Sequence, residues 1–208
     1  IKFHESGQTQ LAIDRLNEAI KVDPQFVEAY RELGKAYEKL GQTDKGLAAF
    51  KQAAKLDLTS FENHMSVARM YEKLDRSPQA AEAYTRAIAL DPNSLDAVSG
   101  AAGCFLKSGQ YVKAQACCEQ MPAHRNELLP LLARAYEGQH DYAGAIDVYE
   151  ELSAAEPSDP NVLLSLGVAY LKAGRFDRAQ DVLVSVTQMR PRDGAALRHL
   201  GYCFIKRG

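Results

Sequence analysis

The sequence predicts an all-α solenoid built from antiparallel helix pairs. Aromatic residues recur at intervals of 34, 34, 34, 31, 34 and 34 residues over the whole chain, and small residues and prolines recur in the same register. A fixed period in this range is typical of repeat proteins in which each unit packs on its neighbours. The aromatic column consists of Phe3, Tyr37, Tyr71, Phe105, Tyr136, Tyr170 and Phe204.

Further columns keep this register. A small residue lies three positions before most of the aromatic residues: Gly34, Ala68, Ala102, Ala133, Gly167 and Gly201. Another lies nine positions after them: Ala12, Gly46, Ala80, Ala114, Ala145 and Ala179. Next come Leu16, Phe50, Tyr84, Cys118, Tyr149 and Leu183, and then Pro24, Pro92, Pro157 and Pro191.

Each unit is predicted to contain two helices. Over residues 26–40, apolar and small residues fall at three- and four-residue steps, which places them on one face of a helix. Gly41 ends that helix, as Gly109 and Gly174 do in their units. A second helix is predicted from about Asp44 to Leu56, and in most units a proline stops it. The small column lets the bulky column of the second helix pack closely against the first.

The third unit is irregular. It is 31 residues long, and Pro122 stands where other units continue their second helix. We expect this helix to stop near Gln120, about a turn early, because proline cannot continue it. Pro130 is expected in the first turn of the next helix, where it is tolerated. A changed superhelical rotation between the units around Tyr84 and Tyr136 is therefore predicted.

These columns resemble the tetratricopeptide repeat. The family's Leu-Gly-x-x-Tyr core is matched at 33–37 and 166–170, and its second-helix signature at Ala80, Tyr84 and Ala87. The resemblance covers the chain as a single array. Its units are a partial repeat at 1–26, repeats at 27–60, 61–94, 95–125, 126–159 and 160–193, and a partial repeat at 194–208. The family's early tryptophan is absent throughout.

The resemblance implies a right-handed superhelix whose first helices line a concave groove that binds a peptide or partner protein. The groove residues that it implies are Arg31, Lys35, Met65, Arg69, Ser99, Gly103, Leu106, Arg134, Leu164, Val168, Leu171, Tyr202 and Ile205. The amino-terminal part of this set is charged and the carboxy-terminal part is apolar. Alternatively, Glu28 with Arg31 and Lys35 with Glu38 form solvated pairs within one helix.

Two specialised grooves of the family are not expected here. The carboxylate clamp uses asparagines and basic residues, but the matching places hold Arg31, Lys35, Ser66, Asp96 and Gly100. The asparagine ladder of the sugar-transferring members is also missing, since Glu32, Ser66, Gly100, Leu131, Ser165 and His199 fill that column.

No catalytic, cofactor or metal site is expected. The glycines in residues 99–103 superficially suggest a phosphate loop, but in register they lie in the middle of a first helix, where Gly100 and Gly103 would open the groove for a bulky ligand group. Cys117, Cys118 and His124 are too few and wrongly spaced for structural zinc, and Cys118 occupies a core column.

Composition narrows the class further. The 208 residues are 46% hydrophobic and 25% charged with a net charge of -2, which is typical of a folded protein and does not suggest nucleic-acid binding. No apolar run is long enough to cross a bilayer and no leader is visible, although the chain starts at Ile1 rather than Met. All four cysteines are expected to be reduced, which favours the cytoplasm; a periplasmic or peripheral membrane location is the alternative.

The predicted function is that of a protein-interaction module without enzymatic activity. The alternatives are a self-assembling scaffold of a bacterial organelle or secretion assembly, and a regulatory arm of a larger enzyme or signalling protein. The last helix carries Leu197, Leu200, Gly201 and Phe204 on the face that a following helix would cover. Ile1 and Phe3 are similarly placed at the other end. We therefore expect further chain or self-association at these open ends.

Overall fold

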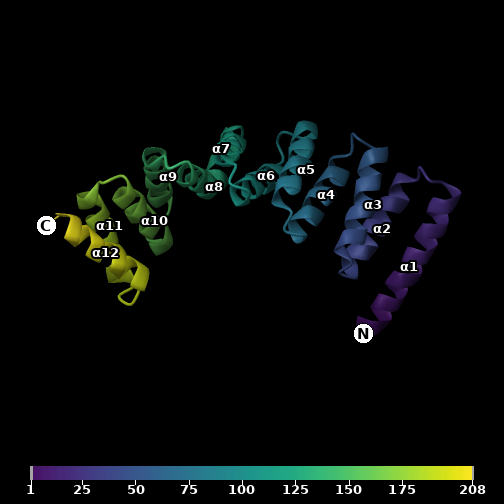
Figure 1. Cartoon of the computed structure of the whole chain (residues 1–208), viewed down its shortest axis with the longest axis horizontal. Coiled ribbons are helices and arrows are strands. Elements are labelled where there is room, and N and C mark those ends of the chain that lie inside the picture. Colours follow the sequence, from purple (N-terminus) through teal and green to yellow (C-terminus); the bar gives the residue numbers. More distant parts are fainter. Residues whose placement is uncertain (1, 208) are drawn as a thin grey trace. The chain divides into compact units, whose positions relative to one another are not determined.

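In the computed structural model, which describes residues 2–207 and the side chains of residues 7–207, the described chain is all α-helical apart from one short 3-10 helix. Its contacts divide it into two compact units, residues 1–108 and 109–208. Figure 1 shows the helices of each unit in chain order. The first unit contains α1 (Lys2–Val22), α2 (Val27–Lys39), α3 (Thr43–Leu56), α4 (Phe61–Lys73), α5 (Ser77–Leu90) and α6 (Leu95–Lys107). The second contains α7 (Tyr111–Glu119), η1 (Pro122–His124), α8 (Arg125–Gly138), α9 (Tyr142–Ala155), α10 (Pro160–Lys172), α11 (Phe176–Met189) and α12 (Gly194–Arg207).

Within each unit, consecutive helices pack against each other, which confirms the predicted all-α fold of sequential helix pairs. The predicted first helix over 26–40 is α2, and the predicted second helix from about Asp44 is α3, so both boundaries fall within about two residues. The boundary between the two units lies inside the predicted repeat 95–125, between α6 and α7.

The small column works as expected. An ideal Cβ on Gly34 would stand 2.7 Å from the ring of Phe50, and one on Gly167 would stand 2.7 Å from Leu183. Both partners come from the second helix of the same pair, and both are buried. Only glycine leaves enough room at these places for the two helices to approach.

The turn inside each helix pair has one backbone conformation. Gly41, Gly109 and Gly174 have φ of 71°, 72° and 74°, and Asp75 and His140, at the same register, have φ of 55° and 59°. The amide three residues beyond the end of α2 is also bonded: Gln42 donates to the carbonyl of Tyr37 at 2.9 Å, and Arg76, Asp141 and Arg175 donate in the same way in their turns. The register, rather than glycine itself, locates this left-handed position.

In the turns between helix pairs, an aspartate carboxylate forms a recurring hydrogen bond. The carboxylates of Asp23, Asp57 and Asp91 each accept a hydrogen bond from the backbone amide two residues later, at 2.9–3.1 Å. These bonds satisfy a backbone donor in the tight connection and favour a turn over further helix. Ser60 and Ser94 then cap α4 and α6 by accepting from the amides three residues on.

The third repeat is shortened as predicted. α7 has 9 residues, whereas α3, α5, α9 and α11 each have 14, and its C-cap is Gln120. η1 follows at Pro122 and leads directly into α8 at Arg125.

The expectation for Pro130 is wrong. Because η1 feeds straight into the helix, α8 begins early and Pro130 is its sixth residue, beyond the first turn. Proline has no amide hydrogen, so the carbonyl of Asn126 lacks its usual helical donor.

α1 differs from the first helix pair that the repeat register would place at the amino terminus. Gly7 is in register with Gly41, yet α1 runs through it as one helix. Ile13 of α1 packs with Leu33 and Ala49, and this contact joins α1 to the first complete pair. The expectations for Ile1 and Phe3 lie outside the residues whose side chains are described.

Candidate functional site

The predicted groove residues of the first unit differ in exposure. On α2, Lys35 is exposed and Arg31 is half-buried. Met65 on α4 is only 2% exposed and Leu106 on α6 is also buried, so these two side chains serve the packing of the unit and offer little surface. The remaining three, Arg69 on α4 and Ser99 and Gly103 on α6, are at least partly accessible.

Charges on this face are paired, but not as the sequence suggested. Lys35 pairs with Glu32 one turn earlier at 2.7 Å, and Glu38 instead accepts from Lys73 on the neighbouring first helix, α4. Arg69 likewise reaches the next first helix, where Asp96 lies 3.7 Å away. The alternative pairing of Lys35 with Glu38 is therefore wrong, because Glu38 lies closer to a cation of the adjacent helix. Exposed pairs of this kind contribute only about 0–1 kcal/mol each to stability.

Of the two glycines expected to open the groove, only Gly103 has open space beside it. A Cβ on Gly103 would meet nothing within 4 Å, whereas one on Gly100 would stand 2.6 Å from the ring of Tyr84. Tyr84 is buried, and its hydroxyl donates to the carboxylate of Glu72 at 2.5 Å. Burial, together with this carboxylate, raises the pKa of Tyr84. The space beside Gly100 thus belongs to the core, and both glycines lie within α6, as the register predicted.

The second unit carries the apolar part of the predicted set. Leu164 and Val168 on α10 are half-buried and Leu171 is buried. Tyr202 and Ile205, on α12, are 46% and 78% exposed. α10 and α12 contact each other, so these residues belong to neighbouring first helices. We call Leu164, Val168, Tyr202 and Ile205 the apolar strip.

Arg134, on α8 in the same unit, is exposed, and among the described residues its side chain makes no ion pair or hydrogen bond. It differs in this from Arg69, its counterpart in the first unit, which has Asp96 nearby. Arg134 is therefore a cation free to meet a ligand's carboxylate or carbonyl oxygen.

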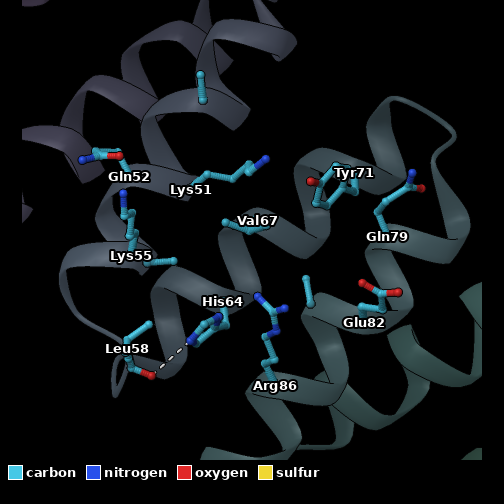
Figure 2. Close-up of a pocket in the computed structure, with 13 residues that line it drawn as sticks. Lys51, Gln52, Lys55, Leu58, His64, Val67, Tyr71, Gln79, Glu82 and Arg86 are labelled. Carbon is cyan, nitrogen blue, oxygen red and sulfur yellow. Dashed lines mark hydrogen bonds between the residues drawn. The ribbon is translucent and has the colours of Figure 1, made fainter.

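The first unit also has a hollow away from this face, and sequence reasoning missed it. It has a volume of about 620 Å³ and lies between α3 and α5, over α4 (Figure 2). We call it the α3–α5 pocket. Its wall residues are Lys51, Gln52, Lys55 and Leu58 on one side, His64, Val67 and Tyr71 on α4, and Gln79, Glu82 and Arg86 on α5. Small residues at Ala48, Ala54 and Ala83 make the hollow possible.

Residues of α4 form the floor of the pocket. Val67 and His64 are 7% and 6% exposed. His64 Nε2 lies 3.1 Å from the carbonyl oxygen of Leu58, drawn as a dashed line in Figure 2. A carbonyl only accepts, so Nε2 is the nitrogen that carries hydrogen here, and the bond fixes the ring against the turn before α4.

Three of the four cysteines lie in the core, and Cys117 is partly buried. All four are free, and Cys104, Cys118 and Cys203 are buried. Burial raises the pKa of Cys104 and of Cys118 to about 12, so each thiol stays protonated and unreactive at neutral pH. Among the described residues there is no group of three or more His, Cys, Asp or Glu that could hold a metal ion. None of the described helices is both long and apolar enough to cross a membrane.

Solved structures share this fold at low sequence identity. The crystal structure of YrrB, described as a TPR protein with an unusual peptide-binding site, superposes with a TM-score of 0.72 at 14% identity over 88% of this chain and 96% of that chain. The structure of MamA 41-end from Desulfovibrio magneticus RS-1 superposes with a TM-score of 0.67 at 19% identity, over 81% of this chain and 97% of that chain. PilF of Pseudomonas aeruginosa superposes with a TM-score of 0.60 at 19% identity, over 87% of this chain and 85% of that chain. At these identities the likeness shows the fold alone.

Family models give the assignment. Models described as tetratricopeptide repeats match residues 75–137, 136–201 and 27–60, and one described as a TPR repeat matches residues 2–41. No curated protein sequence matches the chain. The first of these models alone spans more than half of the 208 residues, so the chain belongs to the tetratricopeptide repeat family.

Proposed function

We propose that this protein-interaction module binds an extended peptide, or an extended segment of a partner protein, along the first helices of its second unit. The apolar strip is the observation that carries the proposal. Tyr202 and Ile205 are large and exposed on α12, and α12 contacts α10, the helix that carries the half-buried Leu164 and Val168. Exposed apolar side chains gathered on one face mark a surface that binds something more often than scattered ones do.

The strip provides affinity and the neighbouring charges provide selectivity. Fully burying a side chain such as Ile205 is worth about 1.5–3 kcal/mol, and a tyrosine adds a hydroxyl that bonds at the edge of an interface. Arg134 offers an unpaired cation on a first helix of the same unit. A segment with aliphatic or aromatic side chains and an acidic residue fits this combination.

Binding, rather than catalysis, is the function that these residues support. The similarity to YrrB supports the same class, since that protein is described as having a peptide-binding site. The carboxylate clamp remains unexpected, because Asp96 lies beside Arg69 and would repel a terminal carboxylate.

A self-assembling scaffold is the second candidate, and one observation favours it. On α12, Leu197 and Phe204 are 48% and 55% exposed, and a Cβ on Gly201 would meet no described atom within 4 Å. In α2 and α10 the matching glycines lie against Phe50 and Leu183. This face of α12 therefore has the features of a helix interface without its partner, and a second copy could cover it.

Peptide display against the 208-residue chain tests the first proposal. A random library of extended peptides would be selected on the wild-type chain, and the best peptide labelled for fluorescence anisotropy. We expect Tyr202→Ser with Ile205→Ser to weaken its binding at least about tenfold, as the loss of two apolar contacts implies. The matched control is Met189→Ser, since Met189 is similarly exposed (45%) but lies on the second helix α11. Equal weakening by the control, or none by the double variant, would contradict the proposal.

A further inference from the structure

The α3–α5 pocket lies on a different face of α4 from the predicted groove. His64, Val67 and Tyr71 line the pocket and follow one another at steps of three and four residues. Met65 and Arg69 are each one or two positions away from that series. At about 100° per residue, this offset turns them well away from the pocket. A ligand in the pocket would therefore be distinct from one on the first-helix face.

The rim of the pocket is positively charged, and its charges are unpaired. Three cations, Lys51, Lys55 and Arg86, face a single anion, Glu82. Among the described residues none of these four side chains forms an ion pair or a hydrogen bond. Elsewhere on the same unit, Lys35, Arg69, Lys73 and Arg76 all have carboxylate partners. Lys51, Lys55 and Arg86 thus place three cations without a carboxylate partner, among the described residues, around one hollow.

The apolar surface of the pocket lies between these charges. Val67 and Ala83 are nearly covered on the floor, while Leu58 is 69% exposed at the rim. In Figure 2, Lys51 extends from α3 toward Tyr71, and Arg86 extends from α5 toward Val67. A ligand lying between the two helices would meet cations on both sides and an apolar floor beneath.

We propose that the α3–α5 pocket is a second binding site, specific for an acidic peptide segment in which carboxylates alternate with aliphatic or aromatic side chains. Lys51 and Lys55 bind two carboxylates from the α3 side, and Arg86 binds a third group from the α5 side. The apolar side chains of the segment cover Leu58 and Val67. This site does not depend on the apolar strip of the second unit.

The spacing of the two lysines sets the register of the peptide. Lys51 and Lys55 are four residues apart on α3, which separates them by about 6 Å along the helix axis. In an extended chain, residues two apart lie on the same side and are separated by about 6.6 Å. Acidic residues at alternate positions therefore match the two cations, and the residues between them are free to contact other walls of the pocket.

A peptide fits the pocket better than a nucleic acid does. Three cations are few against a continuous polyphosphate, Glu82 lies among them, and the chain as a whole has a net charge of -2. A site that binds only phosphate would also leave the apolar floor without a contact, because phosphate groups are polar. Charge alternating with apolar surface is the feature that selects the proposed ligand.

Fluorescence anisotropy with a defined probe tests the proposal. The probe is a fluorescein-labelled peptide Gly-Ser-Glu-Leu-Glu-Leu-Glu-Ser-Gly, with a second peptide carrying Gln for each Glu. The full chain should bind the Glu peptide and not the Gln peptide, and more weakly as salt rises. The variant Lys51→Gln/Lys55→Gln/Arg86→Gln should bind at least about tenfold more weakly, since each exposed charge pair contributes up to about fivefold. Glu82→Gln should bind about two- to threefold more tightly, because it removes the carboxylate that lies among the pocket's lining residues.

Matched variants separate the pocket from general electrostatic attraction. Lys21→Gln/Lys39→Gln/Lys107→Gln removes the same positive charge from other exposed lysines of the first unit and should retain affinity. Leu58→Ser, at an exposed rim position, should weaken the Glu peptide without affecting folding. Equal loss in the two triple variants would overturn the proposal, as would amide chemical-shift changes confined to the first-helix face. Tighter binding of a single-stranded oligothymidine, abolished by the pocket variant, would also overturn it. If the peptide-display test contradicted binding at the apolar strip, the outcomes expected for the α3–α5 pocket would be unchanged.

Discussion

The ring of Phe50 lies where a side chain on residue 34 would begin. An ideal Cβ on Gly34 would stand 2.7 Å from two ring carbons of Phe50, closer than real contacts allow. This contact explains why α2 has a glycine in its middle, although glycine weakens a helix. The ring of Phe50, on the second helix of the pair, fills the space that a larger side chain at residue 34 would occupy.

Gly34→Ala should therefore destabilise the chain by about 1–3 kcal/mol, the usual cost of overpacking a core. Gly103→Ala is the matched control, because it also lies within a first helix but its Cβ would meet nothing within 4 Å. That change should stabilise by up to about 1 kcal/mol through helix propensity alone. Urea unfolding followed by circular dichroism measures both. Phe50→Leu should reduce the cost of Gly34→Ala in a double-mutant cycle, and additive effects would show that the two residues do not interact.

The left-handed turn position gives a second stability prediction. Asp75 has φ of 55°, where a residue with a Cβ is strained by about 1–2 kcal/mol, and its side chain forms no bond among the described residues. Asp75→Gly should therefore raise the unfolding midpoint, while Gly41→Ala, at the equivalent turn, should lower it. His140→Gly should raise the unfolding midpoint less, because it also removes the contact between the ring of His140 and Tyr142. In that contact, Nδ1 of His140 lies 2.9 Å from the hydroxyl of Tyr142. A loss of stability in Asp75→Gly would contradict this account of the turn.

The helices could be read from the sequence because their boundaries are set by short-range signals. Gly41 acts through its own backbone conformation, and Asp23 acts through a carboxylate that accepts from the amide of Gln25, two residues later. The small column acts through a partner at a fixed offset. The failures have longer-range causes. Tyr84 fills the space beside Gly100 from another helix pair, and η1 shifts the start of α8 so that Pro130 lies inside it.

The candidate sites were predictable to a smaller extent. Exposure of Tyr202 and Ile205 follows from their register on α12, but burial of Met65 and Leu106 depends on how neighbouring helices close over them. The α3–α5 pocket was not predicted, because residues from three helices and a turn form it and none of the residues is unusual by itself. Its one sequence signal is the pair Lys51 and Lys55, four residues apart beside Ala48 and Ala54.

Charge reversal on the first-helix face should alter binding more than stability. Arg69 and Arg134 are both exposed, and only Arg69 has a partner, Asp96, at 3.7 Å. We expect Arg69→Glu with Arg134→Glu to weaken binding of the display-selected peptide and to reduce its salt dependence, while the unfolding midpoint changes little. Anisotropy titrations at two salt concentrations measure this. Wild-type affinity in the double variant would remove both arginines from the binding surface.

The buried thiols predict a loss of stability at alkaline pH. Burial raises the pKa of Cys104 and Cys118 to about 12 from the value near 9 of an exposed thiol. The folded chain therefore holds these protons more tightly than the unfolded chain does, so their contribution is complete below pH 9 and falls as pH rises toward 12. Cys104→Ala/Cys118→Ala should have a shallower decline in unfolding midpoint over this range, although its stability at pH 7 is lower. A decline as steep as in the wild type would assign the alkaline loss to the tyrosines instead.

The open face of α12 gives the last prediction. Leu197 and Phe204 are about half exposed on the side where Gly201 meets no described atom, and leaving such side chains in water forgoes roughly 1.5–3 kcal/mol each relative to full burial. We expect the 208-residue chain to self-associate in sedimentation velocity as its concentration rises, and Leu197→Ser/Phe204→Ser to remain monomeric. Tyr202→Ser/Ile205→Ser is the control, because it removes two other exposed apolar side chains from the same helix. If both double variants lower association equally, the contact is not specific to the open face. A strictly monomeric wild-type chain with an ordered α12 would contradict the prediction, because it would show that this face is stable in water without a partner.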